Sequence, residues 1–539
     1  MSSFRNAGLS RREVLKQTGV LSALGVAAAM APASTMAGRD AVEGLVPAGF
    51  PKITGMETTN LFTRIGVRPI VNAHGTFTII SGSRSLPEVK QAMYEASFYF
   101  VQLDELMAAV GKEIAQLTGA PSAIVTTGCE AAIALATVAC TAGTNVEESQ
   151  ALPYVRSKTQ VVIPKHSRNP YDFGVRMTGA EIVEVDSPEE LRAKLTAKVA
   201  MIYVLAGPES AKGPLSIVNI CVIAKEKGVP VFVDAAAEEP LTPNIHLQAG
   251  ATLVGYSGGK CMRGPQAAGL LLGDPSLTHA AFFQAAPHHN YGRAYKVGKE
   301  EIMGMLAAVR QWYKRDHDAE QREWQSWLDH IANRVKGLPS VTTETLQPDD
   351  LSNKSPRLRI HWDATQLKIT GTELVARLDA GTPRIMVDGG TGRRPKMMAS
   401  SLTIMPYMMA AGEEKIVADA IYQGLTRPGS YTDPVVPQGE PAKVNGTWAV
   451  TISYSRGVGE QQFTLMQDGN AVTGTQKGEL YPAVLGGEVH GNEIKLRSNM
   501  KVSGYAVEWN FAGTVAGDSM SGKVELGEYG AADWSARRA

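Results

Sequence analysis

The chain has 539 residues, of which 44% are hydrophobic and 20% are charged, so it is long enough for two or three domains with sizeable cores. Its 53 Lys and Arg residues balance its 53 Asp and Glu residues, which leaves a formal net charge of zero. Because such a chain has no excess positive charge to attract a polyanion, we do not expect a nucleic-acid partner.

Residues 1–37 resemble an export signal of the twin-arginine type. They carry the paired Arg11 and Arg12, an apolar run over 20–33, and then small residues suited to cleavage, with Val14 where the pattern prefers Phe. The apolar run is too short to cross a membrane comfortably, so we expect no stable membrane insertion after the signal is removed. A signal of this kind implies transport by the machinery for folded proteins to the periplasm or another extracytoplasmic space. The alternative is a basic, disordered N-terminus.

Residues 60–425 alternate short β-branched segments with helical patterns. Examples are SAIVTTG followed by CEAAIALATVACTAG, and AMIYVLAG followed by LSIVNICVIAKEKG. This alternation predicts an α/β fold with a mainly parallel sheet, and the continuous apolar segments fit strands that are buried on both faces. We assign 60–300 to a large domain and 301–425 to a connecting helix and a small α+β domain.

The C-terminal part has a different composition. Residues 426–445 are rich in Pro and Gly, as linkers are. From 446 to 539, short alternating segments are separated by turns such as QDGN, HGNE and AGDS. They predict an all-β meander of about eight strands that closes, or half closes, into a small barrel.

Four cysteines occur in the chain: Cys129, Cys140, Cys221 and Cys261. They have neither C-x-x-C spacing nor an accompanying His cluster, so we predict no metal site and no disulfide scaffold. Most of them are expected to be small buried hydrophobic residues.

Three segments of the large domain carry residue types that suit one cofactor. Asp234 ends the segment VPVFVD, Lys260 follows the glycine-rich turn of YSGGKCMRG, and TTGCEAA has the pattern of a strand end, a glycine turn and a helix start. Ligands of open parallel sheets bind beyond the carboxyl ends of the strands, and a helix N-terminus suits a phosphate group. Taken singly, Asp234 could instead cap a helix and Lys260 could lie in a surface turn.

Together the three segments predict a binding site for the cofactor pyridoxal 5′-phosphate (PLP). A lysine can form a Schiff base with an aldehyde, and a carboxylate can keep a pyridine nitrogen protonated so that the ring draws in electrons. We therefore assign Lys260 as the Schiff-base lysine and Asp234 as the partner of the ring nitrogen. Ser257 is expected to add a hydrogen bond to the phosphate.

The order of these motifs resembles that of fold-type I PLP enzymes, which have the aspartate aminotransferase fold. Residues 60–425 are most similar to the family that contains bacterial selenocysteine synthase (seryl-tRNA selenium transferase) and D-glucosaminate-6-phosphate ammonia-lyase. The similarity lies in FTRIGVRPIVNAHGTFTIISGSR, EIAQLTGAPSAIVTTGCEAAIALA, NPYDFGVRMTGAEIVEV and YSGGKCMRGPQAAGLLLG. It implies a homo-oligomer, a dimer or larger, because fold-type I enzymes usually build their active site across a dimer interface.

The resemblance also implies roles for individual residues. One of His166, Arg168 or Tyr171 would lie beside the cofactor ring. Arg84 is a candidate for binding a substrate carboxylate, and Arg384 is its rival, a choice that stays open here. The residues that would hold the phosphate are Gly128, Cys129 and Glu130, and those that lie where the family builds its substrate site include Asn72, Thr76 and Arg84.

The activity implied is that of a lyase acting on a small polar amino acid or amino sugar acid. Lys260 would take the α-proton, a β-substituent would leave, and the products would be a 2-oxo acid and ammonia. The export signal and the zero net charge do not fit an aminoacyl-tRNA substrate, so only the class of chemistry is carried over. Two alternatives stay open. One is other PLP chemistry, such as that of a selenium transferase, aminotransferase, racemase or carbon–sulfur lyase, and the other is a non-catalytic binding protein that has kept the fold.

Overall fold

The computed structural model describes residues 59–154, 157–395 and 399–539. The chain divides into two compact units, residues 1–67 and residues 68–539. Of the first unit only residues 59–67 are described, and they contain the short 3-10 helix η2 (Thr63–Ile65). The predicted export signal therefore lies outside the described residues. No helix within the described ranges has the length and apolar composition needed to cross a membrane.

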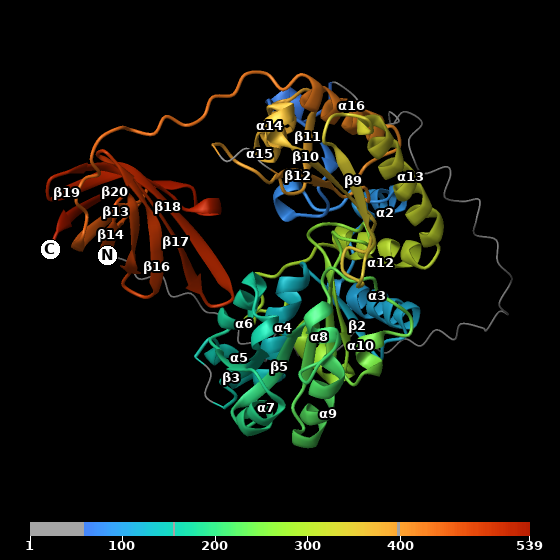
Figure 1. Ribbon diagram of the computed structural model, residues 1–539. Helices are drawn as coiled ribbons and strands as arrows, with labels where there is room; N and C mark the ends of the chain where they lie inside the picture. Colours follow the sequence, from blue (N-terminus) through green and yellow to red (C-terminus); the bar gives the residue numbers. More distant parts are fainter. Residues whose placement is uncertain (1–58, 155–156, 396–398) are drawn as a thin grey trace, which may run out of the picture. The chain divides into compact units, whose positions relative to one another are not determined.

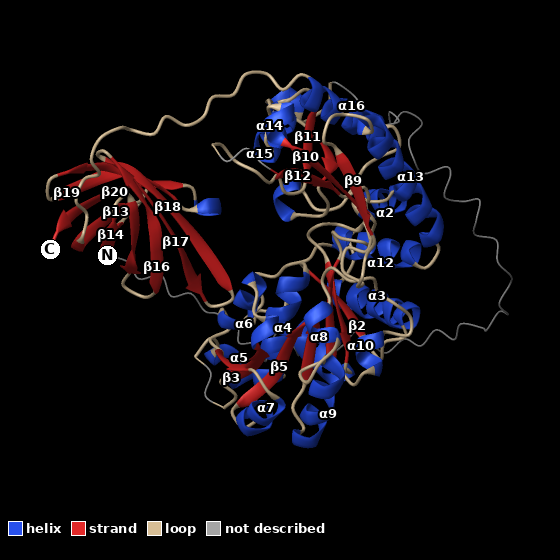
Figure 2. Cartoon of the chain, viewed as in Figure 1, coloured by secondary structure: helices blue, strands red, loops and turns tan. Residues whose placement is uncertain are grey.

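A seven-stranded sheet forms the centre of the large domain (Figure 2). β8 runs antiparallel to both of its neighbours, and the other neighbouring strands are parallel. The sheet is therefore mainly parallel, as the alternation of strands and helices predicts. In spatial order its strands are β2 (Ala123–Thr126), β8 (Gly269–Gly273), β7 (Leu253–Ser257), β6 (Val231–Asp234), β5 (Val199–Leu205), β3 (Gln160–Pro164) and β4 (Glu181–Val185).

Helices pack against this sheet because its central strands are apolar along most of their length (Figure 1). Every residue of β6 is buried, and every residue of α4 (Cys129–Ala142) except Glu130 is buried as well. A parallel strand with cover on both faces needs apolar side chains in both directions, which explains the continuous apolar segments of the sequence. The other helices of this domain are α2 (Pro87–Ala96), α3 (Leu103–Thr118), α5 (Val146–Ala151), α6 (Phe173–Arg176), α7 (Pro188–Lys194), α8 (Pro208–Ala211), α9 (Ile217–Lys227), α10 (Ile245–Gln248), α11 (Pro275–Gln284) and α12 (Lys299–Trp312).

A smaller α+β domain is built around two short sheets. In the first, β10 (Arg357–Asp363) lies between β9 (Thr342–Leu346) and β12 (Ala399–Ile404) and is antiparallel to both. In the second, β1 (Ile70–Ala73) pairs in parallel with β11 (Arg384–Val387). The helices that share their hydrophobic core are α13 (His317–Val335), α14 (Ala364–Leu367), α15 (Gly371–Ala380) and α16 (Glu413–Thr426).

Two elements, β1 and α12, pack in a different domain from the one predicted for them. Val71 and Ala73 of β1 are buried in the core of the small domain, although residues 60–300 are predicted as the large domain. Conversely, α12 contributes Met305 and Trp312 to the core of the large domain, although a connecting helix was expected from residue 301 onward. Hydrophobic periodicity shows which face of an element is buried, but not which core receives that face.

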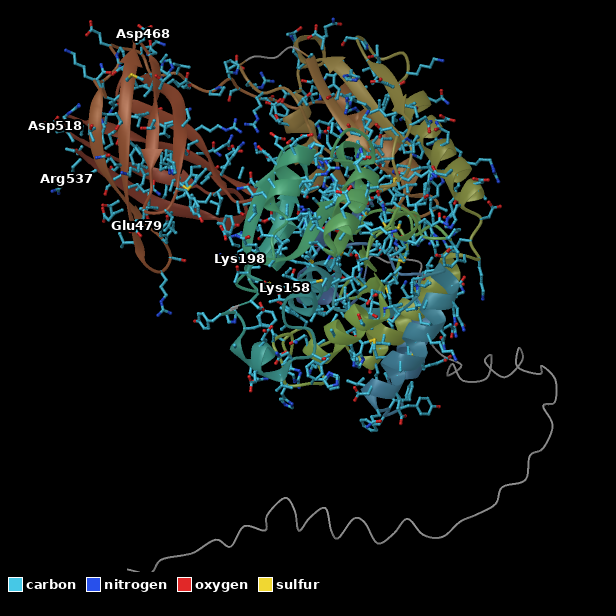
Figure 3. The ribbon with its side chains drawn as sticks, turned by 90° about the horizontal axis from the view of Figure 1, so that it is seen from below. Lys158, Lys198, Asp468, Glu479, Asp518 and Arg537 are labelled. Carbon is cyan, nitrogen blue, oxygen red and sulfur yellow. The ribbon has the colours of Figure 1, made fainter. Side chains whose placement is uncertain are left out.

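The C-terminal strands form a closed barrel of eight antiparallel strands, in which β20 pairs back with β13. This confirms the predicted meander and shows that it closes. Alternate residues from Ile494 to Met500 are buried, as the wall of a filled barrel requires, and Asp468 and Asp518 lie on its outer surface (Figure 3). The segment between α16 and the barrel, predicted as a linker, holds no helix or strand. The strands are β13 (Gly446–Ser453), β14 (Val458–Asp468), β15 (Ala471–Lys477), β16 (Pro482–His490), β17 (Glu493–Val502), β18 (Tyr505–Ala516), β19 (Ser519–Glu525) and β20 (Ala531–Arg538).

Candidate functional site

Asp234 is the last residue of β6, at the carboxyl edge of the large sheet, and it is only 2% exposed. The hydroxyl of Tyr203 donates a hydrogen bond of 2.7 Å to its Oδ2 atom. Its Oδ1 atom accepts hydrogen bonds from the backbone N–H of Ala236 at 3.1 Å and from the thiol of Cys129 at 3.4 Å. All three donors are neutral, and no ion pair found within the described ranges includes Asp234. A buried carboxylate without a cationic partner is costly, so this position fits a ligand that brings a positive charge, such as a protonated pyridine ring.

The N-terminus of α4 lies beside this carboxylate. Gly128 precedes the helix with a φ of +97°, a conformation that favours glycine, and no side chain caps the first turn. The backbone N–H groups at this end are therefore available to an anionic ligand, and the helix dipole favours negative charge there. Burial and then the negative charge of Asp234 raise the pKa of Glu130. The contribution of Glu130 to a phosphate site would thus come from its backbone N–H.

Gly269 allows this helix end to approach the sheet closely. A Cβ atom on Gly269 would lie 2.6 Å from the carbonyl carbon of Gly128 and 2.9 Å from the backbone nitrogen of Cys129. Gly269 also pairs in register with Ser257, the last residue of β7. The predicted phosphate ligands Gly128, Cys129 and Ser257 therefore share one small region of the structure.

Lys260 follows β7 in a tight turn. The backbone N–H of Gly264 donates to the carbonyl of Gly258 at 2.8 Å, and the N–H of Arg263 donates to the carbonyl of Lys260 at 2.9 Å. A Cβ atom on Gly258 would lie 2.7 Å from the sulfur of Met305, which explains the glycine at this position. Lys260 lies close enough to α4 for its charge to affect the pKa of Cys129. Burial and the charge of Asp234 raise that pKa, and the charge of Lys260 lowers it.

His166, Arg168 and Tyr171, the three candidates for a position beside the cofactor ring (the ring-facing candidates), belong to one loop. This loop includes η4 (Lys165–Ser167) and η5 (Pro170–Asp172). The two ring nitrogens of His166 lie 3.2 Å from the carbonyl of Leu215 and 3.0 Å from the hydroxyl of Ser167. Arg168 binds the carboxylates of Asp172 and Glu184.

Tyr171 of the same loop is the candidate with an electrostatic link to the site. Burial raises the pKa of its hydroxyl, and the charges of Asp234 and Glu130 raise it further. Tyr171 therefore lies within electrostatic range of the buried carboxylate. The assignment of one of the three side chains to the cofactor ring stays a prediction.

The predicted substrate-binding residues Asn72 and Thr76 differ in their hydrogen-bond partners. The amide of Asn72 closes a local turn, because its Oδ1 accepts from the backbone N–H of Gly75 at 2.9 Å and its Nδ2 donates to the carbonyl of the same residue at 2.9 Å. Thr76 is buried, and its backbone N–H donates to the hydroxyl oxygen of Tyr407 at 3.1 Å. Its hydroxyl lies 3.2 Å from Oδ1 of Asn353. Asn353 and Tyr407 were missed by the sequence analysis, since neither stands in a motif that distinguishes it from an ordinary loop residue.

Both candidates for carboxylate binding already have an acidic partner. Arg84 binds Glu413 at 3.0 Å, and Arg384, at the start of β11, binds Asp379 at 2.7 Å. Arg84 is the one attached to the lysine turn, because its carbonyl accepts a hydrogen bond of 3.0 Å from Nε of Arg263. Arg263 has a φ of +55°, in the left-handed region that a residue other than glycine seldom adopts. The sequence feature that could have pointed to Arg263 is a cationic residue in a glycine-rich turn, three residues after Lys260.

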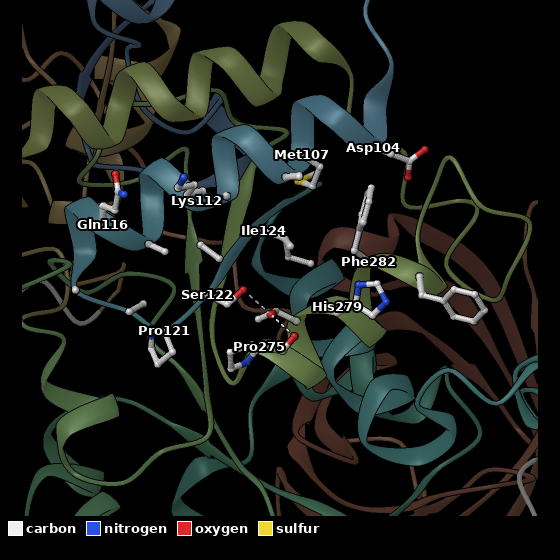
Figure 4. Close-up of a pocket in the computed structure, with 18 of the residues that line it drawn as sticks. Asp104, Met107, Lys112, Gln116, Pro121, Ser122, Ile124, Pro275, His279 and Phe282 are labelled. Carbon is white, nitrogen blue, oxygen red and sulfur yellow. Dashed lines mark hydrogen bonds between the residues drawn. The ribbon is translucent and has the colours of Figure 1, made fainter. Parts of the chain in front are cut away.

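A cavity of 820 Å³ lies between α3 and α11, beside the edge strand β2 (Figure 4). Met107, Ile124 and Phe282 form part of its apolar wall. Neither Asp234 nor Lys260 lines this cavity, so it is separate from the candidate site.

Comparison with known proteins agrees with this geometry. Residues 75–294 match the family described as "Cys/Met metabolism PLP-dependent enzyme". The chain is 26% identical over 371 residues to D-glucosaminate-6-phosphate ammonia lyase of Salmonella typhimurium, with 67% of this chain and 96% of the relative covered. It is 30% identical over 380 residues to 5'-C-glycyluridine monooxygenase-decarboxylase of a Streptomyces species, with 68% and 92% covered. It is 25% identical over 285 residues to L-seryl-tRNA(Sec) selenium transferase of Hyphomonas neptunium, with 47% and 58% covered.

A solved structure of D-glucosaminate-6-phosphate ammonia-lyase has the same fold. Its superposition gives a TM-score of 0.59 at 24% sequence identity and covers 68% of this chain and 99% of that one. The fold-type I prediction for the α/β part is therefore confirmed.

Proposed function

The chain belongs to the family of Cys/Met metabolism PLP-dependent enzymes, and we propose that it is a lyase that releases ammonia from a small polar amino acid or amino sugar acid. The family confirms two predictions, namely that the protein is an enzyme and that PLP is its cofactor. The lyase chemistry is supported by the relative named as an ammonia lyase, because the match with this chain covers 96% of that relative's length. The chemical class of the substrate is taken from that relative's amino sugar acid.

The observation that carries the proposal is the buried carboxylate of Asp234, which faces neutral donors at the edge where α4 begins and Lys260 follows β7. When bound, PLP supplies an electron-withdrawing ring that makes the α-proton of an amino acid acidic. Asp234 would hold the proton on the ring nitrogen, and the N–H groups at the start of α4 would bind the phosphate. The amine of Lys260 would take the proton from Cα and then return a proton to the leaving group.

A screen for product formation tests the proposal. The PLP-loaded protein is incubated with small polar amino acids and amino sugar acids, with and without a phosphate group, and ammonia and 2-oxo acid are measured together. The proposal predicts equal amounts of both from at least one of these compounds, and none from the Lys260→Ala protein. Conversion that requires a keto acid acceptor would instead identify an aminotransferase.

A second candidate is an oxygen-dependent decarboxylation. It is favoured by the 30% identity to the Streptomyces relative, whose name describes a monooxygenase-decarboxylase. The two candidates differ in their need for oxygen. A lyase releases ammonia equally well under nitrogen, whereas the alternative consumes oxygen, releases carbon dioxide and stops when oxygen is removed.

Export and assembly belong to the proposal as well. The paired Arg11 and Arg12 and the apolar run after them support transport to an extracytoplasmic space, and fractionation of cells that express the Arg11→Lys, Arg12→Lys double variant tests this. The variant is expected to stay in the cytoplasm.

A homo-oligomer is proposed from the resemblance to fold-type I enzymes, and light scattering of the purified protein tests it.

A further inference from the structure

Tyr203 is a fully buried residue of β5 that makes the shortest hydrogen bond to Asp234. Its hydroxyl lies 2.7 Å from Oδ2, against 3.1 Å and 3.4 Å for the two donors to Oδ1. The phenol ring is held by a stacked contact with Phe232 of β6, with 6.0 Å between the ring centroids. The direction from which Tyr203 approaches the carboxylate is thus set by two adjacent strands of the core.

The direction of this hydrogen bond is fixed by its surroundings. Burial and then the negative charge of Asp234 raise the pKa of Tyr203, so that the phenol keeps its proton and donates it to the carboxylate. The phenol oxygen in turn accepts a hydrogen bond of 2.8 Å from Nδ2 of Asn169. The result is a one-way chain of donors from Asn169 through Tyr203 to Asp234.

Asn169 belongs to the loop that carries the ring-facing candidates. Its Nδ2 also donates to the carbonyl of Ser167 at 2.8 Å, and its Oδ1 accepts from the backbone N–H of Tyr171 at 2.8 Å. The same side chain therefore shapes this loop and binds the phenol that faces Asp234. A change in the loop at 165–172 would be transmitted to the carboxylate.

We propose that Tyr203, held by Asn169, is a positioning residue that orients the Asp234 carboxylate toward the ring nitrogen of PLP. A carboxylate bound on Oδ2 by a fixed donor cannot rotate freely, and its negative charge stays directed at the position of the ring nitrogen. The inference rests on PLP as the cofactor and not on the lyase reaction proposed above. Its test uses no substrate, so failure of either proposal can be recognised separately.

The chain offers a matched control in Tyr256. This tyrosine lies on β7, the other neighbour of β6, and is 1% exposed. Its hydroxyl accepts a hydrogen bond of 2.7 Å from Nδ2 of Asn244, whereas the hydrogen bonds to Asp234 come from Tyr203, Ala236 and Cys129. Tyr203→Phe and Tyr256→Phe thus remove the same buried atom from the same sheet, and only the first removes a donor to Asp234.

The experiment compares the dissociation constants of PLP and of an analogue whose ring nitrogen is replaced by carbon. Cofactor-free wild-type protein, Tyr203→Phe and Tyr256→Phe are titrated with each compound. We expect Tyr203→Phe to weaken PLP binding about tenfold, in keeping with the loss of one hydrogen bond to a charged group, and to leave binding of the analogue within about twofold of wild type. Tyr256→Phe should bind both compounds as the wild type does.

Equal loss of affinity for both compounds in Tyr203→Phe would overturn the proposal, because it would show a general packing effect. Unchanged PLP binding in Tyr203→Phe would overturn it too. If Tyr203→Phe does not fold, Asn169→Ala keeps the phenol and provides the same comparison. A weaker but still nitrogen-dependent loss of PLP affinity in Asn169→Ala supports the proposal, and no such difference contradicts it.

Discussion

The guanidinium of Arg84 binds the carboxylate of Glu413 at 3.0 Å, which ties the segment after β1 to the first turn of α16. Glu413 is the buried member of the pair, with 4% of its side chain exposed, against 33% for Arg84. The other oxygen of Glu413 accepts a hydrogen bond of 2.7 Å from the backbone N–H of Ala410. A substrate carboxylate that used Arg84 would therefore share this cation with a buried acid.

Replacing Arg84 with alanine should affect both stability and substrate binding. The substitution leaves Glu413 buried without its cation, which we expect to cost about 1–3 kcal/mol of unfolding free energy. Arg384→Ala is the control, because its partner Asp379 is 41% exposed and a surface pair contributes about 0–1 kcal/mol. Denaturant unfolding measures the first effect, and the KM of an identified substrate measures the second. An unchanged KM in Arg84→Ala together with a raised KM in Arg384→Ala would transfer the carboxylate-binding role to Arg384.

Gly269→Ala should damage the phosphate site without changing any polar group. The added Cβ would meet the backbone of Gly128 and Cys129 at 2.6 and 2.9 Å, so the start of α4 would have to move. We expect PLP affinity to fall by about tenfold or more and stability to fall by about 1–3 kcal/mol. Gly486→Ala in the barrel is the matched control, since its Cβ would meet no atom within 4 Å. Wild-type affinity for PLP in Gly269→Ala would show that α4 does not hold the phosphate.

Glu320 should make the protein sensitive to acid. Burial acts to raise the pKa of Glu320, but hydrogen bonds from His317 and Arg315 outweigh it and lower the pKa to about 2. A carboxyl whose pKa is lower in the folded than in the unfolded state stabilises the fold above its unfolded pKa of about 4.5, and this stabilisation is lost as the pH falls toward 2. We expect its contribution to be about 2–3 kcal/mol at neutral pH.

Unfolding of wild type and Glu320→Gln between pH 6 and about pH 3 measures this contribution. The difference in stability between the two proteins should shrink as the pH falls. A difference that is constant over this range would show that the carboxylate charge of Glu320 is not what stabilises the fold.

The cysteines should resist alkylation in the native protein. Burial raises the pKa of Cys140 and of Cys261 to about 12 and that of Cys221 to about 11, and it raises the pKa of Cys129 strongly. Since the thiolate is the reactive form, labelling with iodoacetamide at pH 8 should be slow for all four and fast after denaturation. Rapid native labelling of Cys129 would contradict its buried position at the start of α4, beside Asp234.

The sequence was most informative where one residue type can satisfy a local requirement. Asp234 at the end of an apolar strand, Gly128 before a helix, and Lys260 after two glycines are each recognisable because strand ends, helix starts and tight turns have narrow chemical requirements. The turn residues of the C-terminal strands predicted their antiparallel pairing for the same reason, and the structure showed in addition that the strands close into a barrel.

Contacts between distant segments could not be predicted in this way. Tyr203 is a polar residue within an otherwise apolar strand, and only the parallel pairing of β5 with β6 brings its hydroxyl to Asp234. Tyr407 reaches Thr76 across 331 positions of the chain, and no local pattern encodes that distance. The packing of β1 into the small domain likewise depends on its pairing with β11, which the sequence of β1 alone does not specify.

The most direct test of the central claim is to reduce the PLP-loaded protein with borohydride and map the modified peptide. The account predicts an absorbance band between about 300 and 500 nm that changes on reduction, as a lysine-bound PLP should give, and a pyridoxyl group on Lys260. A pyridoxyl group on another lysine, or no reducible band after PLP has been added, would contradict the assignment of Lys260 and the site built around it.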